Sequence, residues 1–367
     1  MTNWKLCTVG DLCSSISETY SRTDAKVVLV NTSDVLNGKI LNHQSINNEN
    51  LKGQFKKTFK RDDILYSEIR PANKRFAYVD FDETANYIAS TKLMVLRTNP
   101  NLVNPRFLFY FLTSYNVLTE LQHLAETRSG TFPQITFSSE LAPIPILLPD
   151  SNTQVKIINI LKTIDDKIEL NIKINENLEQ QAQSIYTNMF PNVLDPEAKE
   201  TLSELITFSN GKKRPNSIGP VPVYGGNGIL AYTADSNANN CVVIGRVGAY
   251  CGNTFLCMGN CWVSDNAIQA KSKYSDSPLF IYYLLKNASL QSRHIGTGQP
   301  LMTQGILNSI PVSIPEKDKI NRFLFTCKPI VDKMSSNVIE SATLASIKDV
   351  LLPKLMSGEL DVSNINT

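Results

Sequence analysis

The sequence lacks the features that mark membrane, secreted and nucleotide-hydrolysing proteins. It has no run of about 18 apolar residues, and its first residues show no basic-then-apolar signal pattern, so we expect a cytoplasmic protein. Seven cysteines stand at positions 7, 13, 241, 251, 257, 261 and 327, an odd and scattered set that argues against a disulfide framework. No G-x-x-x-x-G-K-[ST] phosphate loop is present, so the chain is not expected to hydrolyse ATP.

Motifs for metal binding and catalysis are also incomplete. Four of the cysteines fall between positions 241 and 261, but they lack paired C-x2-C spacing, so we expect buried small hydrophobes rather than a metal site. Asn99-Pro100-Asn101 and Asn104-Pro105-Arg106 fall short of the Asn-Pro-Pro-aromatic motif of amino-methyltransferases. Pro149-Asp150 and Glu197-Ala198-Lys199 resemble halves of a nuclease motif, but the first caps a helix and the second lies in a polar linker. We therefore expect no catalytic residue, metal or cofactor.

The composition is that of a folded protein with room for two domains. Of 367 residues, 42% are hydrophobic and 19% charged. The net charge of +2 does not by itself indicate nucleic-acid binding. Positive charge is nevertheless concentrated, since residues 201–315 hold eight Lys and Arg against four Asp and Glu, whereas residues 151–200 hold five against eight. This uneven distribution of charge is compatible with a local DNA-binding surface on the variable domains, although it does not require one.

One long-period repeat is the most informative feature present. Residues 130–190 and 298–356 share a pattern at a shift of about 166 positions, which lays Pro145 on Pro311 and Pro149 on Pro315. Solenoid repeats are far shorter, roughly 20 to 50 residues. The chain is therefore predicted to be a duplicated domain with a helix appended to each copy, a pseudo-twofold arrangement suited to duplex DNA.

Each appended helix carries a heptad seam. From Ser151, which with Gln154 has the form of a capping box, residues in 4,3 spacing continue to Phe190, and Pro191 supplies the stop. The first seam is Ile157, Leu161, Ile164, Ile168, Asn171, Asn175, Leu178, Ala182, Ile185 and Met189, and the second is Phe323, Cys327, Ile330, Met334, Asn337, Ser341, Leu344, Lys348, Leu351 and Leu355.

The seams predict an antiparallel coiled coil in which polar groups meet. Asn171 and Asn175 in the first seam, and Asn337 and Ser341 in the second, are expected to hydrogen-bond across the interface. The alternative is two helices packed separately on their own domains, with these residues in solvent. Two prolines of the second helix are expected to disturb it: Pro329 near its start, and Pro353, which should end or kink it early.

A β-rich stretch precedes each helix. Strands are predicted at 27–30, 64–66, 76–79 and 92–96 with a helix at 105–127, and again at 221–224, 241–245, 253–258 and 267–270 with a helix at 278–292. We expect an α+β chain with two pseudo-twofold-related domains, each a twisted mixed β-sheet with flanking helices, separated by the coiled coil. The predicted boundaries are 1–150, helix 151–190, linker 191–200, 201–315, helix 316–356 and tail 357–367.

Several segments together match a known family. They are LITFSNGKKRPNSIGPVPVYGGNGILAYT, VVIGRVGAYCGNTFLCMGNCWVSDNAI, the ILLP and VSIP entries to the helices, and LLPKLMSGEL. The chain resembles the specificity (S) subunits of Type I restriction-modification systems. TVGDLCSSI and DDILYSEIRPANKRF correspond only loosely to ITFSNGKK and NCVVIGRVGAYCGNTF of the second domain. The resemblance implies a non-catalytic subunit whose two target-recognition domains read different half-sites of double-stranded DNA.

The resemblance also implies partners: two methyltransferase (M) subunits held on the helices, and a restriction (R) subunit that joins this core. The helices, roughly 60 Å long at about 1.5 Å per residue, would set the spacing between half-sites. A stand-alone DNA-binding regulator or a coiled-coil adaptor without methyltransferase partners remains the alternative.

Candidate DNA contacts are basic, amide and aromatic residues of the predicted loops. Arginine pairs bidentately with guanine, Gln pairs with adenine, and Lys positions the protein on phosphates. Solvated surface charge, or turns joining domain to helix, are the alternatives. The candidates are Lys56, Lys57, Lys60, Arg61, Arg70, Lys74, Arg75, Arg128, Gln134, Lys212, Lys213, Arg214, Tyr224, Asn227, Arg246, Tyr250 and Gln299.

Overall fold

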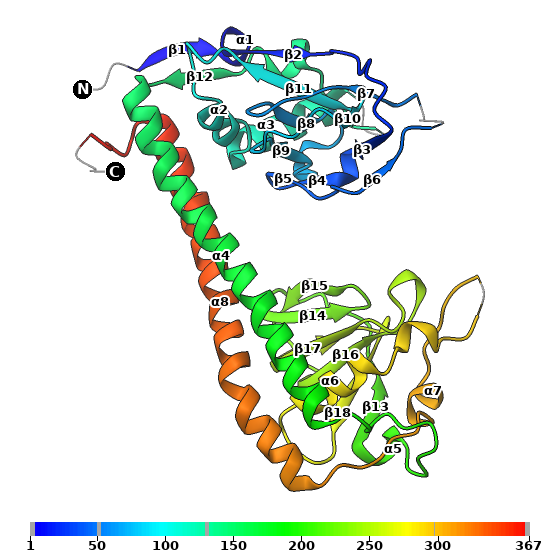
Figure 1. Cartoon of the computed structure of the whole chain (residues 1–367). Helices are drawn as coiled ribbons and strands as arrows, with labels where there is room; N and C mark the ends of the chain where they lie inside the picture. Colours follow the sequence, from blue (N-terminus) through cyan, green and yellow to red (C-terminus); the bar gives the residue numbers. More distant parts are fainter. Residues whose placement is uncertain (1–3, 50–52, 129–131, 297, 364–367) are drawn as a thin grey trace. The chain divides into compact units, whose positions relative to one another are not determined.

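The structure is a computed structural model that describes residues 4–49, 53–128, 132–296 and 298–363. The chain forms two compact units, which we call the first unit (Met1–Leu170 with Glu340–Thr367) and the second unit (Asn171–Ile339). Each unit has a β-rich part and a portion of two long helices, α4 (Ser151–Met189) and α8 (Lys317–Ser357) (Figure 1).

The β-rich part of the first unit contains two four-stranded sheets rather than the single sheet predicted. Its elements are β1 (Lys5–Thr8), α1 (Val9–Leu12), β2 (Cys13–Ile16), β3 (Lys26–Val30), β4 (Val35–Leu36), β5 (Lys39–Ile40), β6 (Ser45–Asn47), β7 (Phe55–Lys57), β8 (Ile64–Ser67), β9 (Phe76–Tyr78), β10 (Tyr87–Ser90), β11 (Leu93–Thr98), α2 (Pro105–Leu112), α3 (Tyr115–Arg128) and β12 (Pro145–Leu148). The sheet orders are β6-β3-β10-β7 and β2-β11-β8-β9.

Two separate hydrophobic cores explain this division. In β8, Ile64 and Tyr66 face one core together with the α2 residues, while Leu65 faces a second core that includes Val28 and Val30 of β3. Because successive residues of a strand point to opposite faces, β8 is buried on both sides. The second sheet therefore covers the face that the helices leave open.

The second unit has one six-stranded sheet. Its elements are α5 (Leu202–Leu205), β13 (Ile206–Asn210), β14 (Val221–Gly225), β15 (Gly228–Thr233), β16 (Ala238–Gly245), β17 (Thr254–Val263), β18 (Ala267–Ser272), α6 (Leu279–Asn287) and α7 (Gln304–Asn308). The order is β13-β18-β16-β17-β14-β15, and β14 runs parallel to β17 while the other neighbours are antiparallel. The mixed sheet predicted for this domain is confirmed.

The repeat extends into the registers of the two sheets. Strands β2-β11-β8-β9 correspond to β13-β18-β16-β17, and the pair Ile64–Leu96 corresponds to Val242–Ala270. Each copy also begins in the same way: Thr8 pairs with Pro145, and Thr201 pairs with Pro311. The segment TVGDLCSSI therefore matches TLSELITFS, not ITFSNGKK as predicted.

The two domain helices are shorter than predicted. The helix expected over 105–127 is interrupted between α2 and α3, where the Thr113 hydroxyl donates to the Phe109 carbonyl at 2.8 Å and Ser114 begins a new helical turn. The helix expected over 278–292 stops at Asn287, and Ser289 has φ +50°. Short polar side chains compete for the backbone at both breaks.

The ends of the long helices differ from the prediction in two ways. At the start of α4, Asp150 caps the helix, as predicted for Pro149-Asp150, because its carboxylate accepts from the Thr153 N–H at 3.0 Å and from the Thr153 hydroxyl at 2.8 Å. These bonds lower the pKa of Asp150. This cap takes the place of the predicted Ser151–Gln154 capping box. The helix α8 continues through Pro329 and Pro353 to Ser357, so the predicted early end at Pro353 is wrong. Pro329 is exposed, and water can satisfy the carbonyl that it leaves without a donor.

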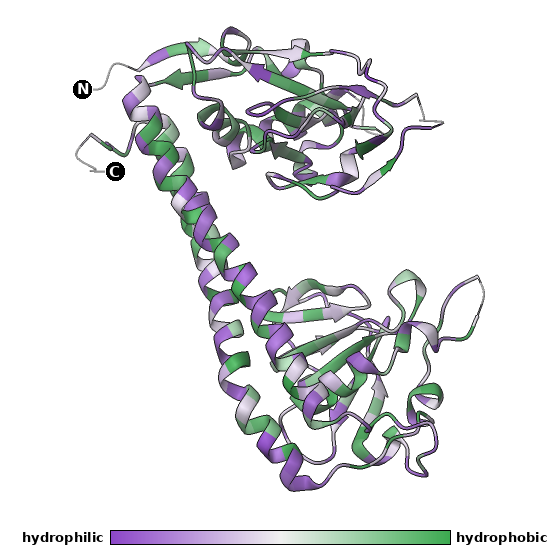
Figure 2. Cartoon of the chain, in the orientation of Figure 1, coloured by the Kyte–Doolittle hydropathy of each residue, from purple (hydrophilic) through white to green (hydrophobic). Residues whose placement is uncertain are grey.

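The residues of the two predicted heptad seams are shielded from solvent. No seam position of α4 or α8 is exposed, and hydrophobic and hydrophilic residues alternate along both helices (Figure 2). In the second unit, Asn337 Nδ2 donates to Asn175 Oδ1 at 2.8 Å, and Asn175 Nδ2 donates to the Met334 carbonyl at 3.1 Å. Asn171 Nδ2 reaches the Asn337 carbonyl at 3.5 Å. The helices are antiparallel here, and the alternative of solvated seam residues is wrong.

In the first unit, the single charged seam position has a partner. Lys348 Nζ lies 2.6 Å from Asp165 Oδ1, and the Tyr110 hydroxyl donates to Asp165 Oδ2 at 2.9 Å. The lysine also lies over the Tyr110 ring, 5.0 Å from its centroid. This network joins α2, α4 and α8, which explains why Lys348 departs from the apolar pattern.

Candidate nucleic-acid interface

In the second unit, the loop between β16 and β17 carries Arg246 and Tyr250. The Arg246 N–H donates to the Asn266 carbonyl at 3.0 Å, and the Arg246 carbonyl accepts from the Met302 N–H at 2.8 Å. The Arg246 side chain is half-buried, whereas Tyr250 is 47% exposed. The loop backbone is thus fixed, which limits the backbone entropy that the loop loses on binding a ligand.

The segment that precedes α7 lies against this loop. The Gly248 N–H donates to the Pro300 carbonyl at 2.9 Å, and Val247 pairs with Leu301. Gln299 is therefore next to the loop, and its side chain is exposed. By sequence alone the loop and the segment are separate candidates, and the fold brings them together.

The glycine turn between β14 and β15 adjoins the same loop. A Cβ on Gly226 would lie 3.6 Å from Tyr250 Cβ, and a Cβ on Gly245 would lie 2.1 Å from the Tyr250 carbonyl oxygen. Glycine is needed at position 245 because no side chain fits that approach. In the turn itself, Asn227 is exposed and available to a ligand.

Tyr224, which precedes this turn, belongs to the core instead. Its ring packs against Phe255, with 6.4 Å between the ring centroids. Burial raises the pKa of the Tyr224 phenol. The position of Tyr224 does not support its predicted contact with DNA.

The basic run of the second unit lies at the same edge of the sheet. The Lys212 N–H donates to the Val263 carbonyl at 2.9 Å, and the Lys212 carbonyl accepts from Trp262 Nε1 at 3.1 Å. The side chains of Lys212, Lys213 and Arg214 are exposed. We call this edge, made of residues 212–214, 225–228, 246–252, 264–266 and 299–301, the loop edge of the second unit.

The first unit has a matching loop between β8 and β9. Arg70 and Lys74 flank a 3-10 turn at Pro71–Asn73, and both have left-handed backbone conformations, with φ of 46° and 53°. Non-glycine residues adopt this conformation only when their surroundings impose it. Here Gln122 of α3 accepts a hydrogen bond from the Ala72 N–H at 3.0 Å. Both basic side chains are exposed.

The two loops make equivalent backbone hydrogen bonds. The Glu68 N–H donates to the Lys92 carbonyl at 3.0 Å, as the Arg246 N–H donates to the Asn266 carbonyl at 3.0 Å. The Ile135 N–H donates to the Glu68 carbonyl, as that of Met302 donates to the Arg246 carbonyl. Glu68 therefore stands where the second unit has Arg246, and Lys92 stands where it has Asn266.

A further pair of bonds supports this equivalence. The Arg70 N–H donates to the Pro133 carbonyl at 3.2 Å, and the Gly248 N–H donates to the Pro300 carbonyl at 2.9 Å. The predicted match between DDILYSEIRPANKRF and NCVVIGRVGAYCGNTF is thus correct, although it is loose in sequence.

Sequence reasoning missed Glu68 and Lys92. Lys92 Nζ lies 3.4 Å from the Glu68 carboxylate and 3.4 Å from Gln134 Oε1, so these residues form one polar group beside the loop. The sequence does contain a signal for Glu68: it follows the strand segment ILYS (β8) directly, as Arg246 follows VVIG (β16). A search for basic residues alone passes over an acidic one.

Lys57 is used within the protein. Its Nζ donates to the Thr91 and Leu93 carbonyls at 3.0 and 2.8 Å, and burial lowers its pKa. Its position argues against the predicted phosphate contact. Lys56 and Lys60 remain exposed.

Three arginines of the first unit also have internal partners. Arg75 Nη1 donates to the carbonyls of Ser33 and Val35 at 3.0 and 3.3 Å. Arg61 lies 2.7 Å from the Asp82 carboxylate, and Arg128 lies 3.1 Å from that of Glu140. Both side chains of the Arg61–Asp82 pair are exposed, 50% and 72%, so Arg61 can exchange partners at little cost. Arg128 is 51% exposed, but its partner Glu140 is only 12% exposed. Of the segment around Arg128, residues 129–131 lie outside the described residues.

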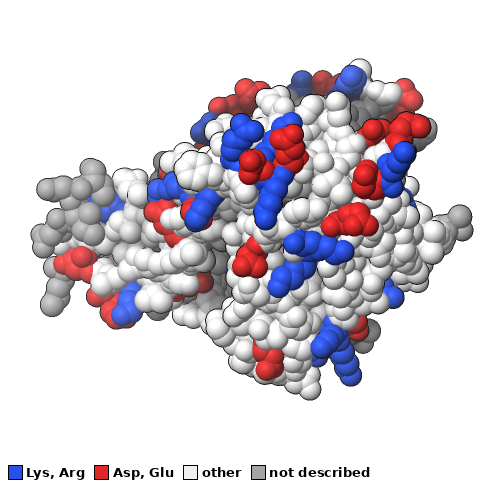
Figure 3. Space-filling view, turned by 90° about the horizontal axis from the view of Figure 1, so that it is seen from below, with Lys and Arg blue, Asp and Glu red and all other residues white. Residues whose placement is uncertain are grey.

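Charge on the visible surface is mixed. On the face drawn in Figure 3, Lys and Arg side chains are interspersed with Asp and Glu. Charge on this face favours short-range contacts over a broad attractive field.

Among the described residues, no helix is both long and apolar enough to cross a membrane.

Comparison with known proteins gives consistent results. A family model described as the Type I restriction modification DNA specificity domain matches residues 1–180 and 199–340. The chain is 47% identical over 191 residues to the Type I restriction enzyme HindI specificity subunit of Haemophilus influenzae, a match that covers 52% of this chain and 41% of that protein. The matched part is thus less than half of that relative.

More distant similarity covers more of the chain. It is 22% identical over 311 residues to the Type I restriction enzyme MjaIX specificity subunit of Methanocaldococcus jannaschii, covering 71% of this chain and 70% of that protein. The crystal structure of a Type I restriction-modification S subunit from M. genitalium matches with a TM-score of 0.52 and 19% identity, over 97% of this chain and 96% of that chain. The fold is shared.

Proposed function

The chain belongs to the family of Type I restriction modification DNA specificity domains, and on this premise we propose that it selects the DNA site for a Type I restriction-modification complex. Each unit reads one half of an asymmetric, bipartite site in double-stranded DNA. One observation carries the proposal: the two loops share their backbone hydrogen bonds but have Glu68 and Arg246 at the equivalent position. A common frame with different side chains suits two half-sites of different sequence.

In the second unit, the loop edge divides the work between bases and phosphates. Arg246 reads a guanine through O6 and N7, and Asn227, Tyr250 and Gln299 add contacts from the neighbouring segments. The exposed run 212–214 holds phosphates.

In the first unit, Glu68 accepts from a cytosine amino group. The negative charge of Glu68 is balanced by Lys92, Arg70 and Lys74, which also contact the phosphates of the DNA backbone. The two half-sites therefore differ in sequence where these loops meet them.

The paired helices hold the partners and set the spacing. Two methyltransferase (M) subunits dock on α4 and α8, a restriction (R) subunit joins the core, and this chain itself performs no chemistry. At about 1.5 Å per residue, the 39 residues of α4 give roughly 58 Å, which limits the separation of half-sites to about 17 base pairs at about 3.4 Å each.

The test is to express the chain with and without its methyltransferase partner and to map methylated adenines. We expect a bipartite, asymmetric target and co-purification of two M subunits per chain. Seven residues inserted into α4 and α8 at equivalent positions should lengthen the non-specific spacer and leave both half-sites unchanged. DNA binding without any co-purifying methyltransferase would favour a stand-alone regulator. An unchanged spacer would refute the proposal that the paired helices set the distance between half-sites.

A further inference from the structure

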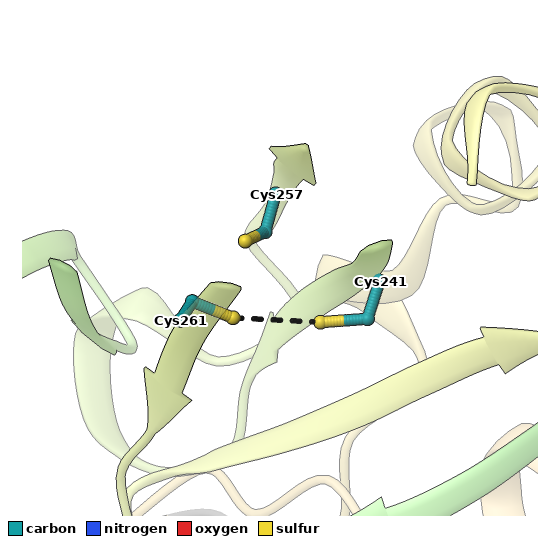
Figure 4. Close-up of side chains that lie close together, drawn as sticks. All are labelled: Cys241, Cys257 and Cys261. Carbon is teal, nitrogen blue, oxygen red and sulfur yellow. Dashed lines mark hydrogen bonds between the residues drawn. The ribbon is translucent and has the colours of Figure 1, made fainter. Parts of the chain in front are cut away.

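Three cysteines of the second unit converge in one small core. Cys241 lies on β16, and Cys257 and Cys261 lie on β17, where alternation places both on the same face. Their Sγ atoms all lie within 4.8 Å of one another, and Figure 4 shows them turned toward a common space. Cys251, the fourth cysteine of this stretch, is apart from them and donates to the Arg246 carbonyl at 3.4 Å.

An irregularity in the strand pairing creates this convergence. Cys241 stands opposite Cys257, and Ala238 stands opposite Cys261, with a register shift between residues 239 and 241. Asn240 has φ +45°, and its side-chain oxygen accepts from the Gly259 N–H at 2.7 Å. This bulge brings Cys241 within reach of two cysteines instead of one.

The distances suit a shared metal ion. Cys241 Sγ and Cys261 Sγ are 3.7 Å apart. With zinc–sulfur bonds of about 2.3 Å, a tetrahedral site separates its sulfurs by about 3.8 Å. A disulfide needs about 2.05 Å, so forming one would require the strands to shift. The three side chains are at most 2% exposed, so the ion would be enclosed by the protein, and a water molecule taken up with it would supply the fourth ligand that tetrahedral zinc needs.

The first unit shows that the fold does not require cysteine here. By strand register, Asp63 stands where the second unit has Cys241, and it forms an ion pair with Arg97 at 2.8 Å. Val79 stands where the second unit has Cys257, since Val79 follows Tyr78, the partner of Ile64. At this position of the sheet, the first unit has an ion pair between neighbouring strands, and the second unit has three thiols.

We propose that Cys241, Cys257 and Cys261 bind one thiophilic metal ion, with zinc as the ion that the geometry fits. Binding replaces three S–H protons, which pass to solvent, by three metal–sulfur bonds. Soft thiolate ligands select zinc or copper(I) over magnesium or calcium. The ion would tie β16 to β17, the strands that carry the loop of Arg246 and Tyr250.

Zinc content tests the proposal without DNA. The full chain is stripped with a chelator under reducing conditions, incubated with zinc chloride and desalted. We expect about one zinc per chain, and a rise in Tm of roughly 5 °C when zinc is at about 100 times its Kd. Cys257→Ser and Cys261→Ser should lose both effects. Cys251→Ser, a buried cysteine of the same unit, should keep both.

Cobalt(II) provides a second readout for variants that fold poorly. Thiolate-to-cobalt charge-transfer absorption in the wild-type chain should saturate at one equivalent, and circular dichroism shows whether each variant is folded. Zinc retention no higher in the wild type than in folded Cys257→Ser would overturn the proposal. So would a Cys241–Cys261 disulfide as the sole change on exposure to peroxide, with no zinc retained. Neither result affects the proposal for DNA reading.

Discussion

The two units share a frame and differ in what they place on it. Four strands, their registers and the bonds that hold the loop after the central strand are common to both. The side chains differ at two equivalent positions. The first unit has Glu68 where the second unit has Arg246, and it has Asp63, the ion-pair partner of Arg97, where the second unit has Cys241. Backbone pairing thus conserves the shape of the site while side chains remain free to change.

The largest effect should come from breaking the ion pair of the first unit. Asp63 is 1% exposed, so Asp63→Ala leaves Arg97 without its main partner and should reduce the free energy of unfolding by roughly 3 kcal/mol. Asp82→Ala, which removes the exposed partner of Arg61, should cost less than about 1 kcal/mol. Urea unfolding measures both. Equal losses would show that the buried pair has no special structural role.

Removing the charge at either of the equivalent loop positions, Glu68 or Arg246, should change the recognition of one half-site and leave that of the other unchanged. Arg246→Ala is expected to weaken discrimination at one base of its half-site by about 1–3 kcal/mol, roughly 5- to 150-fold. Glu68→Gln should act on the other half-site only. Arg322→Ala, an exposed arginine of α8, is the control. Binding to duplexes with single base changes gives the readout, and uniform weakening across all sequences would identify a phosphate contact instead.

The polar residues in the middle of the helix seams, Asn171, Asn175 and Asn337, should matter less for stability than for the register of the two helices. Asn337→Ala removes the donor to Asn175 and should cost about 1.5 kcal/mol, because a buried amide loses its partner. Replacement of Asn171, Asn175 and Asn337 together by Leu should restore or raise stability while loosening the choice of register. Unfolding experiments test the first expectation, and disulfide cross-linking between the helices tests the second. A triple variant as unstable as the single one would contradict this explanation.

The smallest effect separates two adjacent lysines. Lys56→Met should lower DNA affinity and reduce the salt dependence of binding by about one phosphate contact. Lys57→Met should leave the salt dependence unchanged and cost about 1 kcal/mol of stability, because its ammonium serves two backbone carbonyls. If Lys57→Met changes the salt dependence as Lys56→Met does, then Lys57 reaches DNA despite those bonds.

Periodic patterns made much of the architecture predictable. Heptad spacing located both long helices and the polar step at Asn171 and Asn337, because a helix repeats its buried face along a continuous stretch of chain. Short strands such as β8 and β16 followed from local runs of β-branched and aromatic residues. The seven-residue pattern and the 166-residue repeat are properties of the sequence itself.

Contacts between distant segments were decided only by tertiary structure. The second sheet of the first unit, the joining of Gln299 to the Arg246 loop and the internal use of Lys57 all depend on residues tens of positions apart. The cysteine spacing showed four cysteines within 21 residues but not which of them meet, because a one-residue strand shift brings Cys241 to Cys261. Sequence fixes which side chains are present and their local period, whereas proximity across strands depends on register, which is set by the packing of the whole sheet.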